Sequence, residues 1–326
     1  MAQKRVTIKD IAELSGVSFQ AVSSVLHNTG NSRVSEEKAT RVRQIAKKLN
    51  YQPNRAACGL VNKLNYQIGI CFPSYYFEDS YSEMLFYLQC FLQDRGFNSH
   101  IMFWDSLVTR GVNVKNIGNL GIDGLIHCGE IPELFACKLP CLVFGISDKL
   151  HSVVSDYEMS FDLIFEHLLS RGYRKIGYIG SLMDDPMRSD LFRNRLERNG
   201  LEYREEWMLN CMVSYEDGSR VFREFLDKGG ALPEVFVTHN DVIAISAMRE
   251  ARNGGLNVPA DLGFVGYDDI RCSGYVYPAL TTIQVGTRRI AEVLADKMMA
   301  LVRNPETPVE KTVLTPQLIV RESCRN

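Results

Sequence analysis

From residue 66 onward, short apolar strands alternate with amphipathic helices, and this alternation limits the possible folds more than any other feature of the sequence. Strands are predicted over residues 67–72, 99–103, 124–127, 142–144, 175–179, 235–237 and 263–266. Helices are predicted over residues 80–95, 158–171, 188–199, 217–228 and 241–253. Such alternation is typical of parallel, doubly wound sheets, and its two rounds predict an α/β region that contains two of them.

The first 53 residues carry a different pattern, three short helices with no strand. Thr7 and Asp10 have the spacing of a capping box at the start of the first helix, and Gly16 ends that helix. Ser18 is expected to cap a second helix that runs to about residue 27, and Ser35 a third. A helix, a tight turn with glycine and a second helix make up the helix-turn-helix unit, whose second helix enters the major groove of DNA.

The charge of the chain is unevenly distributed. Residues 1–65 hold eleven Lys and Arg against four Asp and Glu, whereas the whole chain has a net charge of −2. A basic segment on an otherwise acidic chain is typical of a protein that binds a polyanion, such as DNA, at one end. A solvated basic face is the alternative that charge alone leaves open.

The headpiece of the LacI/GalR family of bacterial transcription regulators closely resembles the stretch TIKDIAELSGVSFQAVSSVLHN and the later stretch VSEEKATRVRQIAKKLNYQPNRAACGL. The resemblance implies that four side chains of the second helix face base edges: Phe19, Gln20, Ser23 and Ser24. It implies that five others hold phosphates, which set register without reading sequence: Thr7, Ser18, Asn28, Ser35 and Asn54. Gln20 suits adenine, because its amide can donate to N7 and accept from the N6 amine. A capped or solvated helix end is the alternative for each residue.

Ser24 departs from the family, in which most members have arginine at this position. Arginine would bind guanine through two hydrogen bonds, and serine cannot reproduce that contact. We therefore expect the operator of this protein to differ from the family's usual half-site at the base that residue 24 faces.

Residues 54–64 follow the pattern of the family's hinge, in which paired helices of a dimer lie in the minor groove. The resemblance places Ala57 and Leu60 on the DNA, with Leu60 as an apolar wedge that kinks the duplex. A linker residue packed on the protein core is the alternative for Leu60. Because Gly59 weakens a helix that is already too short to persist alone, we expect the hinge to order only on DNA.

The body of the chain resembles the effector domain of the same family, which has the two-lobed fold of periplasmic sugar-binding proteins. The motifs that carry the resemblance are IDGLI (122–126), EHLLSRGYRKIGYIGS (166–181), THNDVIA (238–244), VGYDD (265–269), YPALTTI (277–283) and QLIVRES (317–323). The implied organisation is a headpiece over 1–53, a hinge over 54–64 and an effector-binding and dimerisation domain over 65–326. In that domain the first lobe would cover about 65–155 and 287–314, and the second about 156–286 and 315–326.

The resemblance places a small-molecule effector in the cleft between the lobes, at the carboxyl ends of the strands. Its implied polar contacts are Arg188, Asn240 and Asp268, and the aromatic residues after the first strand, Tyr75, Tyr76 and Phe77, offer rings that can stack on a sugar. The alternatives are simple packing for the aromatic residues, a surface arginine, an asparagine turn and an aspartate cap. A sugar or sugar derivative is the implied class of effector. Two positions depart from sugar-binding relatives: Gly145 stands where they often have Asp, and Val285 stands near where they often have Gln.

Several expectations concern location and assembly. Neither a run of eighteen apolar residues nor a signal peptide is found, so a cytoplasmic location without a membrane partner is expected. The nine cysteines are scattered without a CxxC pair, which favours reduced thiols over a disulfide or zinc site. The leucine-heptad tail of the tetrameric lactose repressor has no counterpart, which predicts a homodimer on a pseudo-palindromic, double-stranded DNA operator.

Two other classes of protein share the predicted fold. A binding protein for transport would need an export signal and no headpiece, and both features point the other way. An enzyme would need a phosphate-binding loop or a nucleophile motif, and neither is found. We therefore expect a regulator without catalytic activity, cofactor or metal site.

Overall fold

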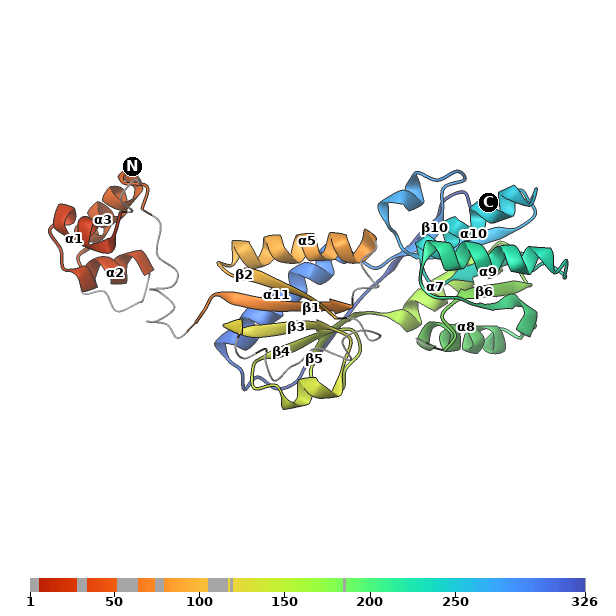
Figure 1. Ribbon diagram of the computed structural model, residues 1–326, viewed down its shortest axis with the longest axis horizontal. Coiled ribbons are helices and arrows are strands. Elements are labelled where there is room, and N and C mark those ends of the chain that lie inside the picture. Colours follow the sequence, from red (N-terminus) through yellow and green to blue (C-terminus); the bar gives the residue numbers. More distant parts are fainter. Residues whose placement is uncertain are drawn as a thin grey trace. The chain divides into compact units, whose positions relative to one another are not determined.

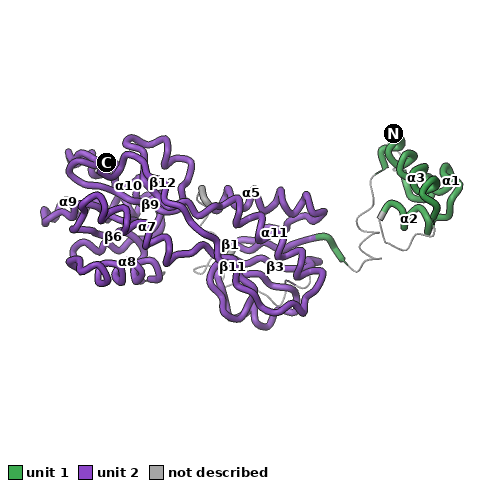
Figure 2. The backbone as a smooth tube through the Cα atoms, turned by 180° about the vertical axis from the view of Figure 1, so that it is seen from behind, with its two compact units in different colours: residues 1–66 green, residues 67–326 purple. Residues whose placement is uncertain are grey.

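The computed structural model describes residues 6–27, 34–51, 64–73, 79–104, 117, 120–183 and 186–325. The chain forms two compact units, residues 1–66 and residues 67–326 (Figure 2). The boundary between the units falls directly before the first strand.

The described residues of the first unit include the helices α1 (Ile8–Ser15), α2 (Phe19–His27) and α3 (Glu36–Lys48). The predicted capping box of α1 is confirmed, because the Asp10 amide donates to Thr7 Oγ1 and the Thr7 amide donates to the Asp10 carboxylate. Ser18 Oγ accepts from the Ala21 amide at 3.2 Å, as predicted for α2. Ser35 occupies the N-cap position of α3 as predicted, but its side chain makes no capping hydrogen bond. Two glutamates in the first turn of α3 favour that end of the helix electrostatically instead.

The second unit contains two six-stranded sheets (Figure 1). In spatial order the first sheet consists of β11 (Lys311–Leu314), β5 (His151–Ser155), β4 (Cys141–Phe144), β3 (Gly124–Cys128), β1 (Gln67–Pro73) and β2 (Asn98–Trp104). The second consists of β12 (Gln317–Ile319), β10 (Thr281–Gln284), β9 (Gly263–Asp268), β8 (Val235–Thr238), β6 (Ile176–Gly180) and β7 (Met208–Asn210). Neighbouring strands are parallel except for β10 and β12, which are antiparallel.

Helices pack on each sheet and define two lobes. In the first lobe, α5 (Asp79–Asp94) and α11 (Thr287–Arg303) pack against each other and against the first sheet (Figure 1). In the second lobe the helices are α7 (Tyr157–Ser170), α8 (Met187–Arg198), α9 (Tyr215–Asp227) and α10 (Asp241–Asn253). The chain crosses between the lobes three times: from β5 to α7, from β10 to α11 and from β11 to β12.

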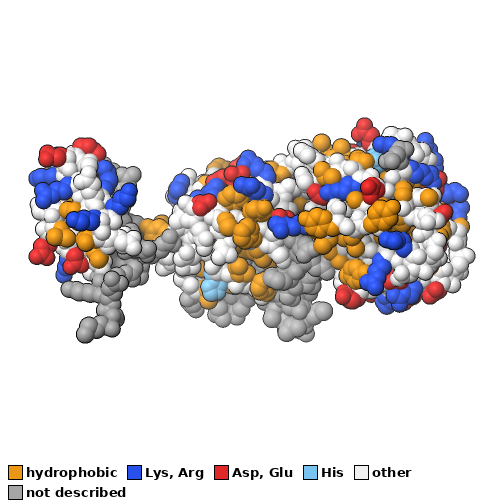
Figure 3. All heavy atoms as spheres, turned by 90° about the horizontal axis from the view of Figure 1, so that it is seen from above, with side chains coloured by type: hydrophobic (Ala, Val, Ile, Leu, Met, Phe, Trp, Pro, Cys, Tyr) orange, Lys and Arg blue, Asp and Glu red, His pale blue; other side chains and the backbone are white. Residues whose placement is uncertain are grey.

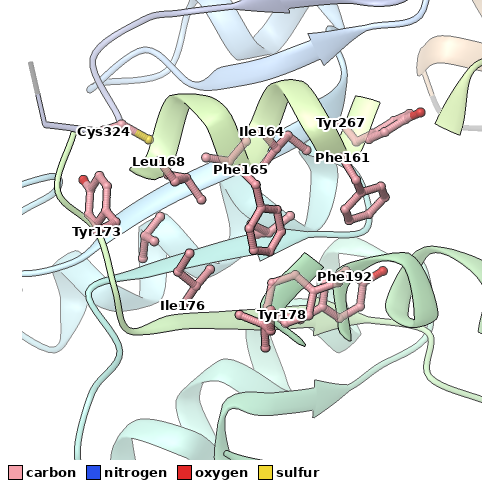
Figure 4. Packing of buried hydrophobic residues seen from close by; sticks show 14 of the residues in the cluster. Phe161, Ile164, Phe165, Leu168, Tyr173, Ile176, Tyr178, Phe192, Tyr267 and Cys324 are labelled. Carbon is pink, nitrogen blue, oxygen red and sulfur yellow. The ribbon is translucent and has the colours of Figure 1, made fainter. Parts of the chain in front are cut away.

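Apolar side chains of α7 fix the second lobe to its sheet (Figure 4). Phe161, Ile164, Phe165 and Leu168 lie on one face of this helix and are buried over β6, where they join Tyr178 and other core residues. Their spacing of three or four residues is the helical period that places side chains on one face. Burial of each large apolar side chain stabilises the fold by about 1.5–3 kcal/mol.

The predicted fold class, a helical headpiece followed by two doubly wound sheets, is confirmed. All the predicted strands and helices are present, with ends shifted by a few residues. The sequence pattern did not predict several further strands and one helix within the described residues: β5, β7, β10, β11, β12 and α11. The missed strands are short and interrupted by polar residues, as in β10 (TTIQ) and β11 (KTVL), so no apolar run marks them in the sequence.

Candidate nucleic-acid interface and ligand cavity

The headpiece holds α2 against a small apolar core and leaves its outer face in solvent. Ile11, Val22, Val25 and Val42 are buried where the three helices meet. The spacing of Val22 and Val25 orients α2, so that the residues between and before them face outward or lie partly buried. A short helix held in this way can enter a groove of DNA without losing its own core contacts.

Phe19 is an exposed aromatic residue at the start of α2, with 50% of its side chain accessible. Single exposed apolar side chains are common on protein surfaces, so this exposure shows only that the ring is accessible to a partner. Gln20 beside it is exposed, and Ser23 and Ser24 are partly buried. The structure therefore places all four predicted base-reading residues on α2, and their contacts with DNA stay a prediction.

The predicted phosphate contacts are divided between described and undescribed parts of the chain. Thr7, Ser18 and Ser35 are exposed at the starts of the three helices. Backbone N–H groups at a helix start favour an anion, which suits a phosphate contact. Asn28, Asn54, Ala57 and Leu60 lie outside the described residues.

In the second unit, a small cavity of about 40 Å³ lies between the two lobes. Its lining comes from both sheets and from the crossovers: Tyr81, Met84, Phe144, Ser155, Tyr157, Arg188, Tyr267, Asp268, Val285, Thr287 and Ile290. Phe144, Ser155 and Asp268 are the last residues of β4, β5 and β9. Because the carboxyl ends of parallel strands gather at one edge of a sheet, both lobes present strand ends to the same space.

Arg188 on α8 is a buried cation within this cavity. Its guanidinium carbon lies 4.1 Å from the ring centroid of Tyr267 and 5.4 Å from that of Tyr157. The two rings are stacked with centroids 6.2 Å apart. Arg188 Nη1 also donates to the backbone oxygen of His239. These contacts fix the direction of the guanidinium group, so that it can serve as an oriented donor for a ligand.

Asp268 gives the cavity a negative charge opposite Arg188. Burial raises the pKa of Asp268 to about 6, and attraction to Arg188 opposes that rise. Burial disfavours the charge of Arg188, but the Asp268 carboxylate and nearby tyrosines raise the Arg188 pKa above its usual value. The pair is therefore charged near neutral pH, and a bound ligand meets both a donor and an acceptor.

Two polar atoms of the lining lack a partner within the described part of the chain. Ser155 Oγ and Arg188 Nε are both buried there without a hydrogen bond. An unsatisfied buried polar group costs about 1–3 kcal/mol, and a ligand that pairs with it recovers that energy. Aromatic walls with a few oriented polar groups are typical of small-molecule sites.

The other predicted effector residues have different positions. Asn240 is buried at the start of α10, where its Oδ1 accepts from the Ile243 amide at 3.0 Å. It is not among the residues that line the cavity, so its assignment to the effector stays a prediction. Tyr75, Tyr76 and Phe77 lie outside the described residues. Sequence reasoning missed Ser155, Tyr157 and Tyr267, although each lies at or next to a strand end.

Gly145 follows β4 with a φ of +135°, which only glycine adopts readily. An aspartate at this position, as in many relatives, would be strained. In this chain the backbone at residue 145 therefore favours glycine over aspartate.

Comparisons with known proteins agree with both parts of the structure. The family described as "Bacterial regulatory proteins, lacI family" matches residues 7–54, and a periplasmic binding protein-like domain matches residues 165–324. Catabolite control protein A of Staphylococcus xylosus is 28% identical, over 96% of this chain and 97% of its own length. The ribose operon repressor of Haemophilus influenzae is 27% identical, over 97% of this chain and 98% of its own length.

A solved structure extends the likeness to three dimensions. The lac repressor dimer bound to operator and the anti-inducer ONPF is 26% identical, with a TM-score of 0.80 that covers 98% of this chain and 99% of that one. No helix in the described ranges is long and apolar enough to cross a membrane. The sequence motifs, the helical headpiece, the two-lobed unit and these full-length matches lead to one conclusion: the chain belongs to the lacI family of bacterial transcription regulators.

Proposed function

We propose that this regulator is a cytoplasmic homodimer that represses transcription from a pseudo-palindromic operator and responds to a small molecule bound between its lobes. Residues 1–53 form the DNA-binding headpiece and residues 54–64 the hinge. The first lobe comprises about 65–155 and 287–314, and the second about 156–286 and 315–326. The observation that supports a small-molecule effector is the cavity that Asp268 lines.

The chemistry of the cavity supports a polar effector that carries hydroxyl groups. Arg188 provides a positively charged donor and Asp268 a negatively charged acceptor. A ligand whose hydroxyl groups accept one hydrogen bond and donate another therefore satisfies both side chains without adding net charge. Tyr157 and Tyr267 offer aromatic surface for an apolar sugar face. A sugar or sugar derivative satisfies both conditions.

Exposed apolar side chains support the homodimer. Phe86 on α5 is 63% accessible, and Phe103 on β2, an edge strand, is 48% accessible. Hydrophobic side chains gather on the face of residues 67–326 that contains α5 (Figure 3). Apolar surface and an open sheet edge favour association with a second copy. Sedimentation of the full chain should give a dimer at micromolar concentration, and a monomer that still bound DNA tightly would contradict this arrangement.

One experiment tests the whole proposal. Operator sequences are selected from random duplex DNA with the full-length protein, and affinity for the selected site is measured with and without a panel of D-ribose, cellobiose, D-galacturonate, D-glucose and hypoxanthine. We expect a palindromic site, affinity that falls steeply with salt through counterion release, and a change in affinity with at least one sugar. Response to hypoxanthine alone would exclude a sugar effector, and no selected site would exclude the DNA-binding role.

The Ser24→Arg variant tests which bases α2 reads. Arginine can reach guanine with two hydrogen bonds, so the selected half-site should gain a guanine preference of about 1–3 kcal/mol at one position. The Ser23→Ala variant is the control, since it removes a hydroxyl from the same helix without adding a guanine contact. Identical selected sites for Ser24→Arg and the original protein would show that residue 24 does not face the bases.

A further inference from the structure

The four residues from Asp268 to Arg271 contact three parts of the effector domain. Asp268 lines the cavity. Asp269 contacts the strands next to two crossovers. Arg271 begins the short helix η5 (Arg271–Gly274) and pairs with Glu83 of α5 in the first lobe, at 3.4 Å. One short segment therefore joins the ligand cavity, the crossovers and the opposite lobe.

Asp269 makes the strongest of these contacts. Its Oδ1 accepts from Arg321 Nη2 at 2.6 Å, and its Oδ2 accepts from Gln284 Nε2 at 2.7 Å. Only 11% of the Asp269 side chain and 23% of the Arg321 side chain are accessible to solvent, so water screens this ion pair little. Gln284 is the last residue of β10, directly before the crossover to α11. Arg321 follows β12, the strand that begins after the crossover from β11.

Arg321 is itself held rigidly, which makes it an effective anchor. Its backbone amide donates to Thr281 Oγ1 at 2.9 Å, and its Nη1 donates to the Leu280 carbonyl at 2.8 Å. Both acceptors lie at the start of β10. The Asp269 carboxylate therefore joins the end of β10, directly before the crossover to α11, to the segment that follows β12.

The backbone at Asp268 and Asp269 has an unfavourable conformation that surrounding contacts must stabilise. Asp268 has a φ of +107° and Asp269 a φ of +55°, and non-glycine residues rarely occupy this left-handed region. Such conformations persist only where surrounding contacts hold them. The hydrogen bonds of Asp269 supply those contacts and keep the neighbouring Asp268 directed toward the cavity.

We infer that Asp269 is the positioning residue that couples the cavity to the crossovers: it fixes Asp268 for the ligand and transmits a change at Asp268 to the angle between the lobes. The inference rests on the proposed function, in which the cavity binds the effector. If the inference is correct, a change at Asp269 alters the response of operator affinity to effector more than it alters the affinity for effector. A residue with a purely structural role would not separate these two quantities.

The first test needs no effector. Hydrogen–deuterium exchange is measured on full-length protein for the original chain, Asp269→Asn and Asp162→Asn. Asp269→Asn removes the negative charge that pairs with Arg321, so peptides that span 281–290 and 312–319 should exchange about tenfold faster, as expected when a charge-assisted hydrogen bond is lost. Asp162→Asn removes a partner of Arg195 at 2.7 Å, away from the crossovers, and should leave those peptides unchanged.

A second variant distinguishes the loss of a hydrogen bond from misfolding of the domain. Gln284 is exposed, so Gln284→Met removes one hydrogen bond of Asp269 without disturbing a core. We expect a smaller acceleration of the same peptides, about threefold. Unchanged exchange in both Asp269→Asn and Gln284→Met would overturn the inference.

The second test measures coupling. With the selected operator and the sugar of the panel that acts on the original protein, Asp269→Asn should bind the sugar within about tenfold of normal, while its operator affinity should change less than twofold on sugar addition. Asp268→Asn should lose sugar affinity and response together. A full response in Asp269→Asn would overturn the coupling role. If no compound acts on the original protein, the effector proposal fails, and the exchange experiment alone decides whether Asp269 holds the crossovers.

Discussion

Replacing Asp241 by alanine should destabilise the effector domain by about 3 kcal/mol or more. Asp241 begins α10 and is fully buried. Its carboxylate accepts hydrogen bonds from the Ile270 amide at 2.9 Å, Ser273 Oγ at 2.6 Å and Thr282 Oγ1 at 2.5 Å. Alanine would leave these three buried donors without their acceptor, and each unsatisfied donor costs about 1–3 kcal/mol. Urea unfolding monitored by the buried Trp207 measures the loss.

The exposed Asp261 provides the matched control. It accepts from the amide and side chain of Asn257 at the surface, so Asp261→Ala should cost less than about 1 kcal/mol. A loss for Asp241→Ala no larger than that of the control would show that the three donors find other partners.

Asp241→Asn separates the charge of this group from its hydrogen bonds. Burial raises the pKa of Asp241 to about 7, although the donors of Ser273 and Thr282 act in the opposite direction. In the unfolded chain the pKa is about 4. Because the folded protein binds this proton more tightly, the contribution of Asp241 to stability is fully present below about pH 4 and is lost as pH rises through about 7. The difference in unfolding free energy between the original protein and Asp241→Asn should therefore shift against the original protein across that range. A difference independent of pH would contradict the raised pKa.

The helices and strands that the sequence predicted correctly are those with a clear hydrophobic periodicity. The helices of the headpiece and the long strands have apolar spacings that only one secondary structure satisfies, as at Val22 and Val25 or over Ile68 to Phe72. The strands β10, β11 and β12 are short, and the polar residues of β10 are paired by tertiary contacts. Thr281 and Thr282, for example, are fully buried in β10 because Arg321 and Asp241 satisfy their hydroxyl groups. Such pairing is invisible in a single sequence.

The same distinction holds for the candidate sites. Arg188 and Asp268 were predicted through motifs of a known family, and the structure brings them into one cavity. Tyr157 and Tyr267 were missed because an aromatic residue next to a strand end is most often part of a core, and both indeed adjoin the core of the second lobe. Asp241 and Asn240 look alike in sequence, as polar residues at a helix start. Only the structure shows that Asn240 caps α10 whereas Asp241 joins three segments.

Replacing Arg188 by methionine should abolish the response to effector. Methionine is a shorter but unbranched and flexible side chain that can still pack against the rings of Tyr157 and Tyr267, and it removes every donor that faces the cavity. It also leaves Asp268 without the cation that stabilises its charge. Loss of a charged hydrogen bond costs about 1.5–3 kcal/mol, and an uncompensated buried charge adds to that. Sugar affinity, measured by calorimetry, should therefore fall by about a hundredfold or more, while affinity for the selected operator should change little.

Two further variants make this result specific to the cavity. Arg193→Met lies on the same helix, but Arg193 is partly exposed and pairs with Asp190, so sugar affinity should stay within about twofold. Arg188→Met combined with Asp268→Asn removes the uncompensated charge. Stability should then recover relative to the single variant, while the response to sugar stays absent because neither hydrogen-bonding role is restored. If Arg188→Met alone still responded normally, the effector would have to bind outside this cavity, and the assignment of the cavity would be wrong even though the family assignment would stand.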